Sequence, residues 1–121
     1  MKGVKFIEEK GIENIRKHEK EIMKYLLQEL KKIQNVKVYG CMDCERIGSV
    51  VSINIEGMDS SQVGYYLNKK NVAVRTGYHC APLIHGILGT ANFGTVRISP
   101  GYFNTFRDID ELLYNIIELS R

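Results

Sequence analysis

Cysteine is scarce in this sequence, which has three among 121 residues. Because an odd number cannot pair completely within one chain, we expect reduced thiols and not a disulfide-stabilised secreted domain. Long apolar runs are also absent, since no stretch approaches the roughly 18 residues of a membrane span. The first residues, Met1-Lys2-Gly3-Val4, do not begin a signal peptide. These absences predict a cytoplasmic protein without a membrane span.

The sequence also has little net charge. Its formal charge is +3 at pH 7. Basic and acidic residues alternate along the first helical stretch, as in Lys17, Glu19, Lys20, Glu21 and Lys24. This alternation is typical of a solvated helix face and not of a stripe that binds phosphates. We therefore expect no nucleic-acid partner.

Length and composition predict one domain. The chain is 44% apolar and 26% charged, which suits a globular protein with one hydrophobic core. Its length is too short for two ordinary domains. We expect a single domain over residues 1–121.

The apolar residues of the first third follow a helical period. They recur at intervals of three, four and seven residues between Ile15 and Ile33, which predicts an amphipathic helix from about Gly11 to Ile33. The apolar residues among 4–7 extend this pattern toward the N-terminus. Gly11 is a weak point at which the helix could kink.

The rest of the chain predicts short strands between capped helices. Asp59 with Gln62, and Thr105 with Asp108, have the spacing of capping boxes that open a helix. The expected helices run from Asp59 to about Lys69, over 81–88 and from Thr105 to the C-terminus, and the expected strands are 36–39, 49–55, 72–74 and 95–99. This order predicts an α+β fold, with a small, mostly antiparallel sheet covered by helices on one face.

One thiol has neighbours that favour its ionised form. Arg75 is a permanent cation five residues before Cys80, and His79 is adjacent to it. Pro82 favours a helical turn that opens just after Cys80, which would bring backbone N–H groups near the sulfur. All three effects lower the pKa of a thiol, so we expect a reactive thiolate. The alternative is that Cys80 is a small buried apolar residue.

The order of residues around Cys80 resembles a known family. The run Arg75-Thr-Gly-Tyr-His-Cys-Ala81 is followed by Thr-Val-Arg97-Ile-Ser and then by Tyr102-Phe-Asn-Thr105. Together they resemble the C-terminal small domain of cysteine desulfurases and selenocysteine lyases, which are class V aminotransferases of fold type I. The specific part is 72–105, and weaker similarity covers nearly the whole chain.

The resemblance implies a chemistry and residue roles. In that family pyridoxal phosphate holds L-cysteine or L-selenocysteine, and an enzyme cysteine takes the sulfur as a persulfide and passes it to an acceptor protein, commonly for iron–sulfur cluster assembly. Cys80 matches the nucleophile and Arg97 the arginine that binds the substrate carboxylate. His79 is then a proton relay, and Arg75 supports the substrate site electrostatically. A homodimer is also implied.

Plainer interpretations of these residues stay open at this point. His79 could merely pack, Arg97 could be an ordinary strand-end arginine, and Arg75 could pair with an acid. Two departures from the family pattern leave the subfamily open. Tyr78 stands where many members have a second histidine, and the spacing from Cys80 to Arg97 is longer than in some branches.

The other half of the family's active site is absent from the sequence. The lysine that binds the cofactor follows a histidine in a larger upstream domain, whereas the histidines here precede Glu19, Cys80 and Gly86, and no lysine follows Lys70. The aspartate for the pyridine nitrogen and the phosphate cradle are missing too. We therefore expect no cofactor on this chain and no desulfurase activity from it alone. The chain is expected to be a truncated or split gene product.

Cys41 and Cys44 form a Cys-x-x-Cys pair. A lone pair is half a zinc site, so we expect no metal. A reversible disulfide and simple loop variation are the other interpretations. His85 receives no predicted role.

Three functions remain open from the sequence. The chain is the small domain of a desulfurase, or a non-catalytic carrier that accepts a persulfide on Cys80 from another desulfurase, or a binding or regulatory domain whose thiol is incidental.

Overall fold

Four short strands form one antiparallel sheet in the order β1-β2-β4-β3. The computed structural model describes residues 2–40, 43 and 48–121. The strands are β1 (Val36–Tyr39), β2 (Val51–Ile55), β3 (Arg75–Gly77) and β4 (Thr95–Ile98), and the helices are α1 (Lys2–Lys10), α2 (Ile12–Leu30), α3 (Ser60–Lys69), α4 (Pro82–Leu88) and α5 (Phe106–Ser120). All of the strand pairs are antiparallel, which confirms the mostly antiparallel sheet that the sequence predicted.

The register separates an apolar face of the sheet from a polar one. Ile53 pairs with Val38 and Val96, whereas the preceding residue, Ser52, pairs with Tyr39 and Arg97. Since successive side chains of a strand point to opposite faces, the apolar set lies on one side and the polar set on the other.

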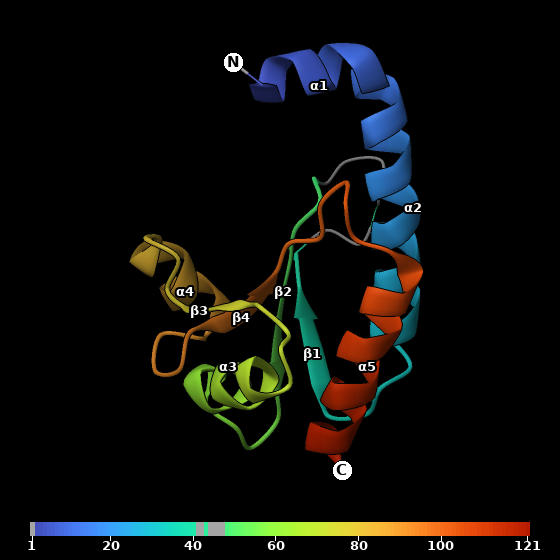
Figure 1. Cartoon of the computed structure of the whole chain (residues 1–121). Helices are drawn as coiled ribbons and strands as arrows, with labels where there is room; N and C mark the ends of the chain where they lie inside the picture. The colour runs from blue at the N-terminus through green and yellow to red at the C-terminus, as the bar shows by residue number, and fades with distance from the viewer. Residues whose placement is uncertain (1, 41–42, 44–47) are drawn as a thin grey trace.

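Helices α2, α3 and α5 cover the apolar face. Figure 1 shows α2 and α5 side by side along the sheet, with α3 next to β3 and β4. The buried cluster joins side chains from these three helices to the inward residues of β2 and β4: Ile22, Met23, Leu26, Leu27, Leu30, Val51, Ile53, Ile55, Val63, Leu67, Val96, Ile98, Ile109, Leu112, Leu113 and Ile116. The expected α+β fold with helices on one face is confirmed.

Gly11 separates α1 from α2. Its φ of 78° lies in the left-handed region, which glycine adopts without steric cost. The N–H of Gly11 still donates to the Ile7 carbonyl and closes α1. The expected kink at Gly11 is therefore a complete break between two helices, and α1 points away from the axis of α2 (Figure 1). No residue of α1 is buried.

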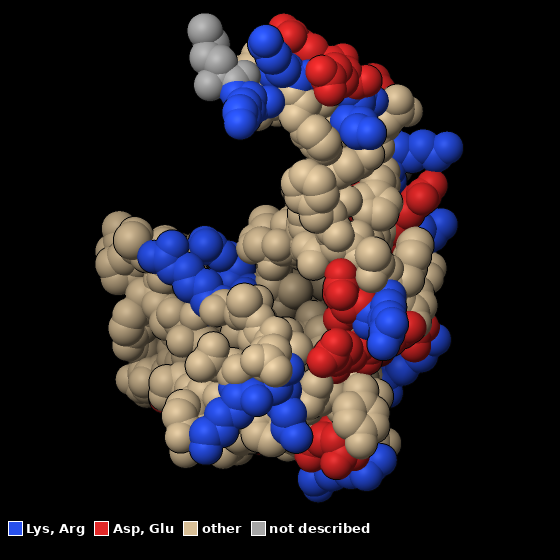
Figure 2. All heavy atoms as spheres, viewed as in Figure 1, with Lys and Arg blue, Asp and Glu red and all other residues tan. Residues whose placement is uncertain are grey.

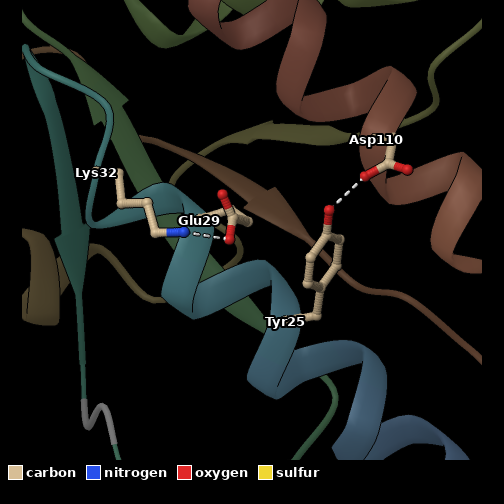
Figure 3. Close-up of polar contacts among 4 residues, drawn as sticks. All are labelled: Tyr25, Glu29, Lys32 and Asp110. Atoms are coloured by element: carbon tan, nitrogen blue, oxygen red, sulfur yellow. Dashed lines mark hydrogen bonds and ion pairs between the residues drawn. The ribbon is translucent and has the colours of Figure 1, made fainter.

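Both predicted capping boxes are present. The Asp59 carboxylate accepts from the Ser61 N–H at 2.8 Å, and the Gln62 side chain accepts from the Asp59 N–H at 3.0 Å. Thr105 and Asp108 make the equivalent reciprocal bonds at the start of α5. A further bond joins α5 to α2, where the Tyr25 hydroxyl donates to Asp110 at 2.6 Å (Figure 3).

The predicted strand over 72–74 is wrong, because β3 begins only at Arg75. Asn71 adopts a left-handed conformation with a φ of 60°. The N–H of Val72 then donates back to the Leu67 carbonyl, as in a Schellman motif that ends α3. The residues that looked like a strand are instead the half-buried exit from this helix.

Two further findings concern predictions outside the sheet. No helix in the described ranges combines the length and apolar character needed to cross a bilayer. The prediction for Cys41 and Cys44 falls on residues outside those that the structure describes.

Candidate functional site

The face of the sheet that α2, α3 and α5 leave uncovered, called the open face below, carries the residues predicted for the site. Residues of the 78–94 segment pack against part of it. Arg75 of β3 and Arg97 of β4 are direct cross-strand partners. Thr95 lies two residues before Arg97 on the same face, and Asn54 of β2 belongs to this face too. His79 and Cys80 follow the end of β3 after Tyr78, so the structure brings together all four residues that the sequence singled out.

Cys80 lies in a tight turn with an unusual backbone. His79 and Cys80 have φ angles of 52° and 62°, and the Ala81 N–H closes the turn on the Tyr78 carbonyl at 2.9 Å. Two left-handed central residues define a turn that glycine or asparagine usually occupies. Each non-glycine residue in this conformation costs roughly 1–2 kcal/mol. The turn is therefore strained, and contacts elsewhere must hold it.

The turn exposes the Cys80 side chain beside a cation. Cys80 is exposed, which excludes the alternative of a buried apolar cysteine. A terminal nitrogen of Arg75, Nη2, lies 4.0 Å from Sγ and donates toward it. Helix α4 begins two residues later with Pro82 in its first turn, as the sequence predicted.

His79 packs beneath the turn against β4. Its Nε2 lies 3.2 Å from the Thr95 carbonyl oxygen and 3.1 Å from Thr95 Oγ1. Because a carbonyl can only accept, we assign the proton to Nε2, which leaves Nδ1 as an acceptor. Burial lowers the pKa of His79, and the positive charge of Arg97 lowers it further. The imidazole is therefore neutral at neutral pH.

Three buried polar atoms of this face have no hydrogen-bond partner among the described residues: Asn54 Oδ1, His79 Nδ1 and Arg97 Nε. An unsatisfied buried polar group costs about 1–3 kcal/mol. The arrangement of two acceptors and one cationic donor therefore favours completion of this face by a polar ligand or by another protein surface.

The charge around the site is one-sided. No Asp or Glu occurs between Asp59 and Asp108, a stretch that includes both site arginines. Neither Arg75 nor Arg97 forms an ion pair with a described residue. Figure 2 shows a block of Lys and Arg surface beside α4, on the concave side of the molecule between α4 and α1. Like charges directly opposite in a sheet repel, so this pair favours a bound anion.

The residues present do not fit pyridoxal phosphate as a covalent cofactor. No lysine follows Lys70, and Lys37, which shares the open face, lies on the opposite edge strand with its Nζ 5.1 Å from the centre of the Tyr39 ring. The acid-free stretch also offers no carboxylate for a pyridine nitrogen. A groove of about 900 Å³ beside β1 is lined by Asn54 and Phe93, but not by Cys80, Arg75 or Arg97.

Sequence reasoning missed two features of this site. The gap between Asp59 and Asp108 was readable and would have indicated an anion site. His85 is buried, with 3% exposure, and bonds to the backbone of the Cys80 turn. Nothing in the local sequence indicates that contact, because it depends on the fold of α4 against the turn.

Comparison with known proteins gives the family. The Aminotransferase class-V family model matches residues 1–112. A cysteine desulfurase of Wigglesworthia glossinidia brevipalpis is 32% identical over 120 residues, which are 99% of this chain and 28% of that protein. A probable cysteine desulfurase of Halalkalibacterium halodurans is 36% identical over 111 residues, which are 91% of this chain and 26% of that protein.

A solved structure agrees with the sequence matches. The apo cysteine desulfurase from Thermococcus onnurineus NA1 superposes with a TM-score of 0.92 at 30% identity, over 98% of this chain and 29% of that one. The chain thus spans less than a third of the length of the relatives that it matches. Matched over nearly all of its residues in sequence and fold, the chain belongs to the aminotransferase class-V family.

Proposed function

We propose that residues 1–121 are the C-terminal small domain of a pyridoxal-phosphate-dependent cysteine desulfurase or selenocysteine lyase. In this proposal Cys80 is the persulfide-forming nucleophile and Arg97 binds the substrate carboxylate. The observation that supports it most is the pairing of Arg75 with Arg97, with Arg75 Nη2 4.0 Å from the Cys80 sulfur. These three residues lie in the stretch from 60 to 107, which contains no Asp or Glu.

The two arginines have separate tasks in this proposal. Arg97 has a buried Nε without a protein partner, and a guanidinium fork matches a carboxylate in a two-pronged bond. Arg75 Nη2 lies 4.0 Å from Cys80 Sγ, and in this proposal its positive charge supports the site where the substrate sulfur meets the thiol. A substrate held by its carboxylate at Arg97 would present its side chain toward the turn.

The sulfur-transfer step balances without an external oxidant. The Cys80 thiolate attacks the substrate sulfur, so that an S–S bond forms while the C–S bond breaks. The electron pair of the C–S bond remains with carbon, which takes up a proton, and the products are L-alanine and a persulfide on Cys80. Pyridoxal phosphate bound in the rest of the enzyme would supply the electron sink.

His79 is the proton relay for this step in our proposal. Its neutral imidazole has a free acceptor at Nδ1, while Nε2 is engaged with Thr95. A neutral histidine beside a reacting thiol can accept and return a proton. We assign His79 this relay role.

The remaining assignments concern partners. The substrate is L-cysteine or L-selenocysteine, the persulfide passes to an acceptor protein, and the complete enzyme is a cytoplasmic homodimer. The concave side between α1 and α4 (Figure 2) is where we place the cofactor-binding domain.

The test uses the complete enzyme that contains residues 1–121 together with its cofactor-binding domain. We expect alanine formation from L-cysteine by the complete enzyme and not by residues 1–121 alone, and complete loss with Cys80→Ser. Arg107→Lys, an exposed change on α5, is the matched control for the site arginines and should leave activity unchanged. Alanine formation that persists in Cys80→Ser would overturn the proposal.

A persulfide carrier is the second candidate, and the exposed thiol beside Arg75 supports it because loading needs no cofactor on this chain. Mixing the chain with an active desulfurase and L-cysteine should then add the mass of one sulfur atom. The gain should disappear in Cys80→Ser. No gain in the unmodified chain would exclude the carrier.

A further inference from the structure

The Cys80 turn is braced at both ends by side chains. Below it, His79 bonds to Thr95 of β4. Above it, the Tyr78 carbonyl accepts the turn's own bond from Ala81 and a second bond from His85 Nε2 at 3.1 Å. A carbonyl oxygen has two lone pairs, so these two donors satisfy it completely.

Burial and a second hydrogen bond hold the His85 side chain in this contact. It is 3% exposed, and its other nitrogen, Nδ1, lies 2.7 Å from the hydroxyl of Thr90, which is fully buried. Because the Tyr78 carbonyl can only accept, the proton must be on Nε2, and Nδ1 accepts from Thr90 in the neutral ring. The ring also packs edge-to-face on Tyr78, with centroids 5.3 Å apart.

The loop that follows α4 completes the brace. The Thr90 N–H donates to the His85 carbonyl at 2.8 Å, and the Tyr78 hydroxyl donates to the Ala91 carbonyl at 2.7 Å. At the end of this loop Gly94 approaches the backbone of Gly77 closely. Both partners of His85 are therefore themselves held in place.

We propose that His85 is a positioning residue for Cys80. It holds the Tyr78 carbonyl through Nε2, and so keeps His79 and Cys80 left-handed and the sulfur next to Arg75. A turn with two strained residues persists only where its surroundings determine it, and His85 is the buried side chain that bonds to its first carbonyl. The inference rests on the proposed function of Cys80, but the geometry of the turn can be measured without any activity.

The test compares three variants of the full chain. His85→Leu removes both ring nitrogens, His85→Gln keeps an N–H donor near the position of Nε2, and Thr90→Val removes only the hydroxyl on the far side. Ile87→Gln, on the exposed face of α4, is the matched control. Backbone couplings report the sign of φ at His79 and Cys80, and the rate of iodoacetamide alkylation at pH 7 reports the environment of the thiol.

We expect His85→Leu to lose the positive φ values and to alkylate roughly three- to tenfold more slowly, which corresponds to one ordinary hydrogen bond. His85→Gln should recover most of the alkylation rate. The rate of Thr90→Val should lie between those of His85→Leu and the parent, and Ile87→Gln should match the parent. Nitrogen-15 shifts of the parent should show Nε2 protonated.

Two results would overturn the proposal: a folded His85→Leu chain with unchanged φ values and rate, or a protonated Nδ1 with a bare Nε2. If His85→Leu does not fold, the nitrogen-15 shifts of the parent decide, since a bare Nε2 contradicts the bond to the Tyr78 carbonyl. Failure of the proposed function would give a different result. Sulfur transfer would then not depend on Cys80, whereas the φ values of the turn would still change in His85→Leu.

Discussion

The two faces of the sheet differ in how completely the described residues pack against them and pair their polar atoms. On the helix-covered face, side chains from α2, α3 and α5 fill the space over β2 and β4, and Ile22, Leu26 and Ile53 are fully buried. On the open face, two arginines oppose each other and three buried polar atoms have no described partner. Apolar burial is thus concentrated on one face, while the other keeps polar atoms without a partner among the described residues. Changes on the two faces should therefore separate stability from function.

The largest expected effect is on the open face. Arg97→Ala in the complete enzyme should lower kcat/KM for L-cysteine roughly a hundredfold, because charged hydrogen bonds to the carboxylate are lost. The melting temperature of the chain should stay the same or rise slightly, since a like-charge pair is relieved. Steady-state kinetics and thermal unfolding test this together. An equal loss in Arg107→Ala would contradict the specific role of Arg97.

The next effect is on the helix-covered face. Leu26→Ala should destabilise the chain by about 2–5 kcal/mol, because it leaves a cavity where the side chain is fully buried. Denaturant unfolding measures this cost. At temperatures where the variant remains folded, Cys80 should alkylate at the parent rate. A changed rate in the folded variant would show that the two faces are coupled.

A smaller effect is expected at Gly94, which lies close to the end of β3 that leads into the Cys80 turn. A Cβ on Gly94 would lie 2.7 Å from the Gly77 backbone, and Gly94 has a φ of 63°. Gly94→Ala should cost about 1–3 kcal/mol through this overlap and should disturb β3. Gly86→Ala is the control, since nothing lies within 4 Å of its Cβ position. Equal stability of the two variants, measured by unfolding, would count against the close approach.

The smallest effect is on acid sensitivity. Hydrogen bonds from Ser61 lower the pKa of Asp59, and those from Thr105 lower the pKa of Asp108, below the ordinary 3.8. The unfolded chain therefore binds more protons, so these bonds stabilise the fold above pH 3.8 and lose this effect as pH falls through the lowered values. Asp59→Asn and Asp108→Asn should flatten that loss in acid unfolding curves. Glu9→Gln, on exposed α1, should leave the curve unchanged.

Local signals account for the elements that the sequence predicted well. A capping box needs only two residues three apart, and Gly11 needs only its own freedom of φ, so both were readable without any tertiary information. The apolar period likewise predicted which side of α2 and α5 is buried. The segment from Val72 to Val74 failed because the left-handed Asn71 directs the Val72 N–H back to α3, and residue type alone does not reveal that choice.

The sequence by itself determined the helices, their caps, the α+β class and the presence of a cysteine flanked by an arginine and a histidine. Only the tertiary structure decided that Arg75 faces Arg97, that His79 bonds to Thr95, and that His85 reaches the Tyr78 carbonyl. The physical reason is that the first group depends on interactions within a few residues. The second depends on strand register and on the packing of α4 against the turn, which are set by the whole core.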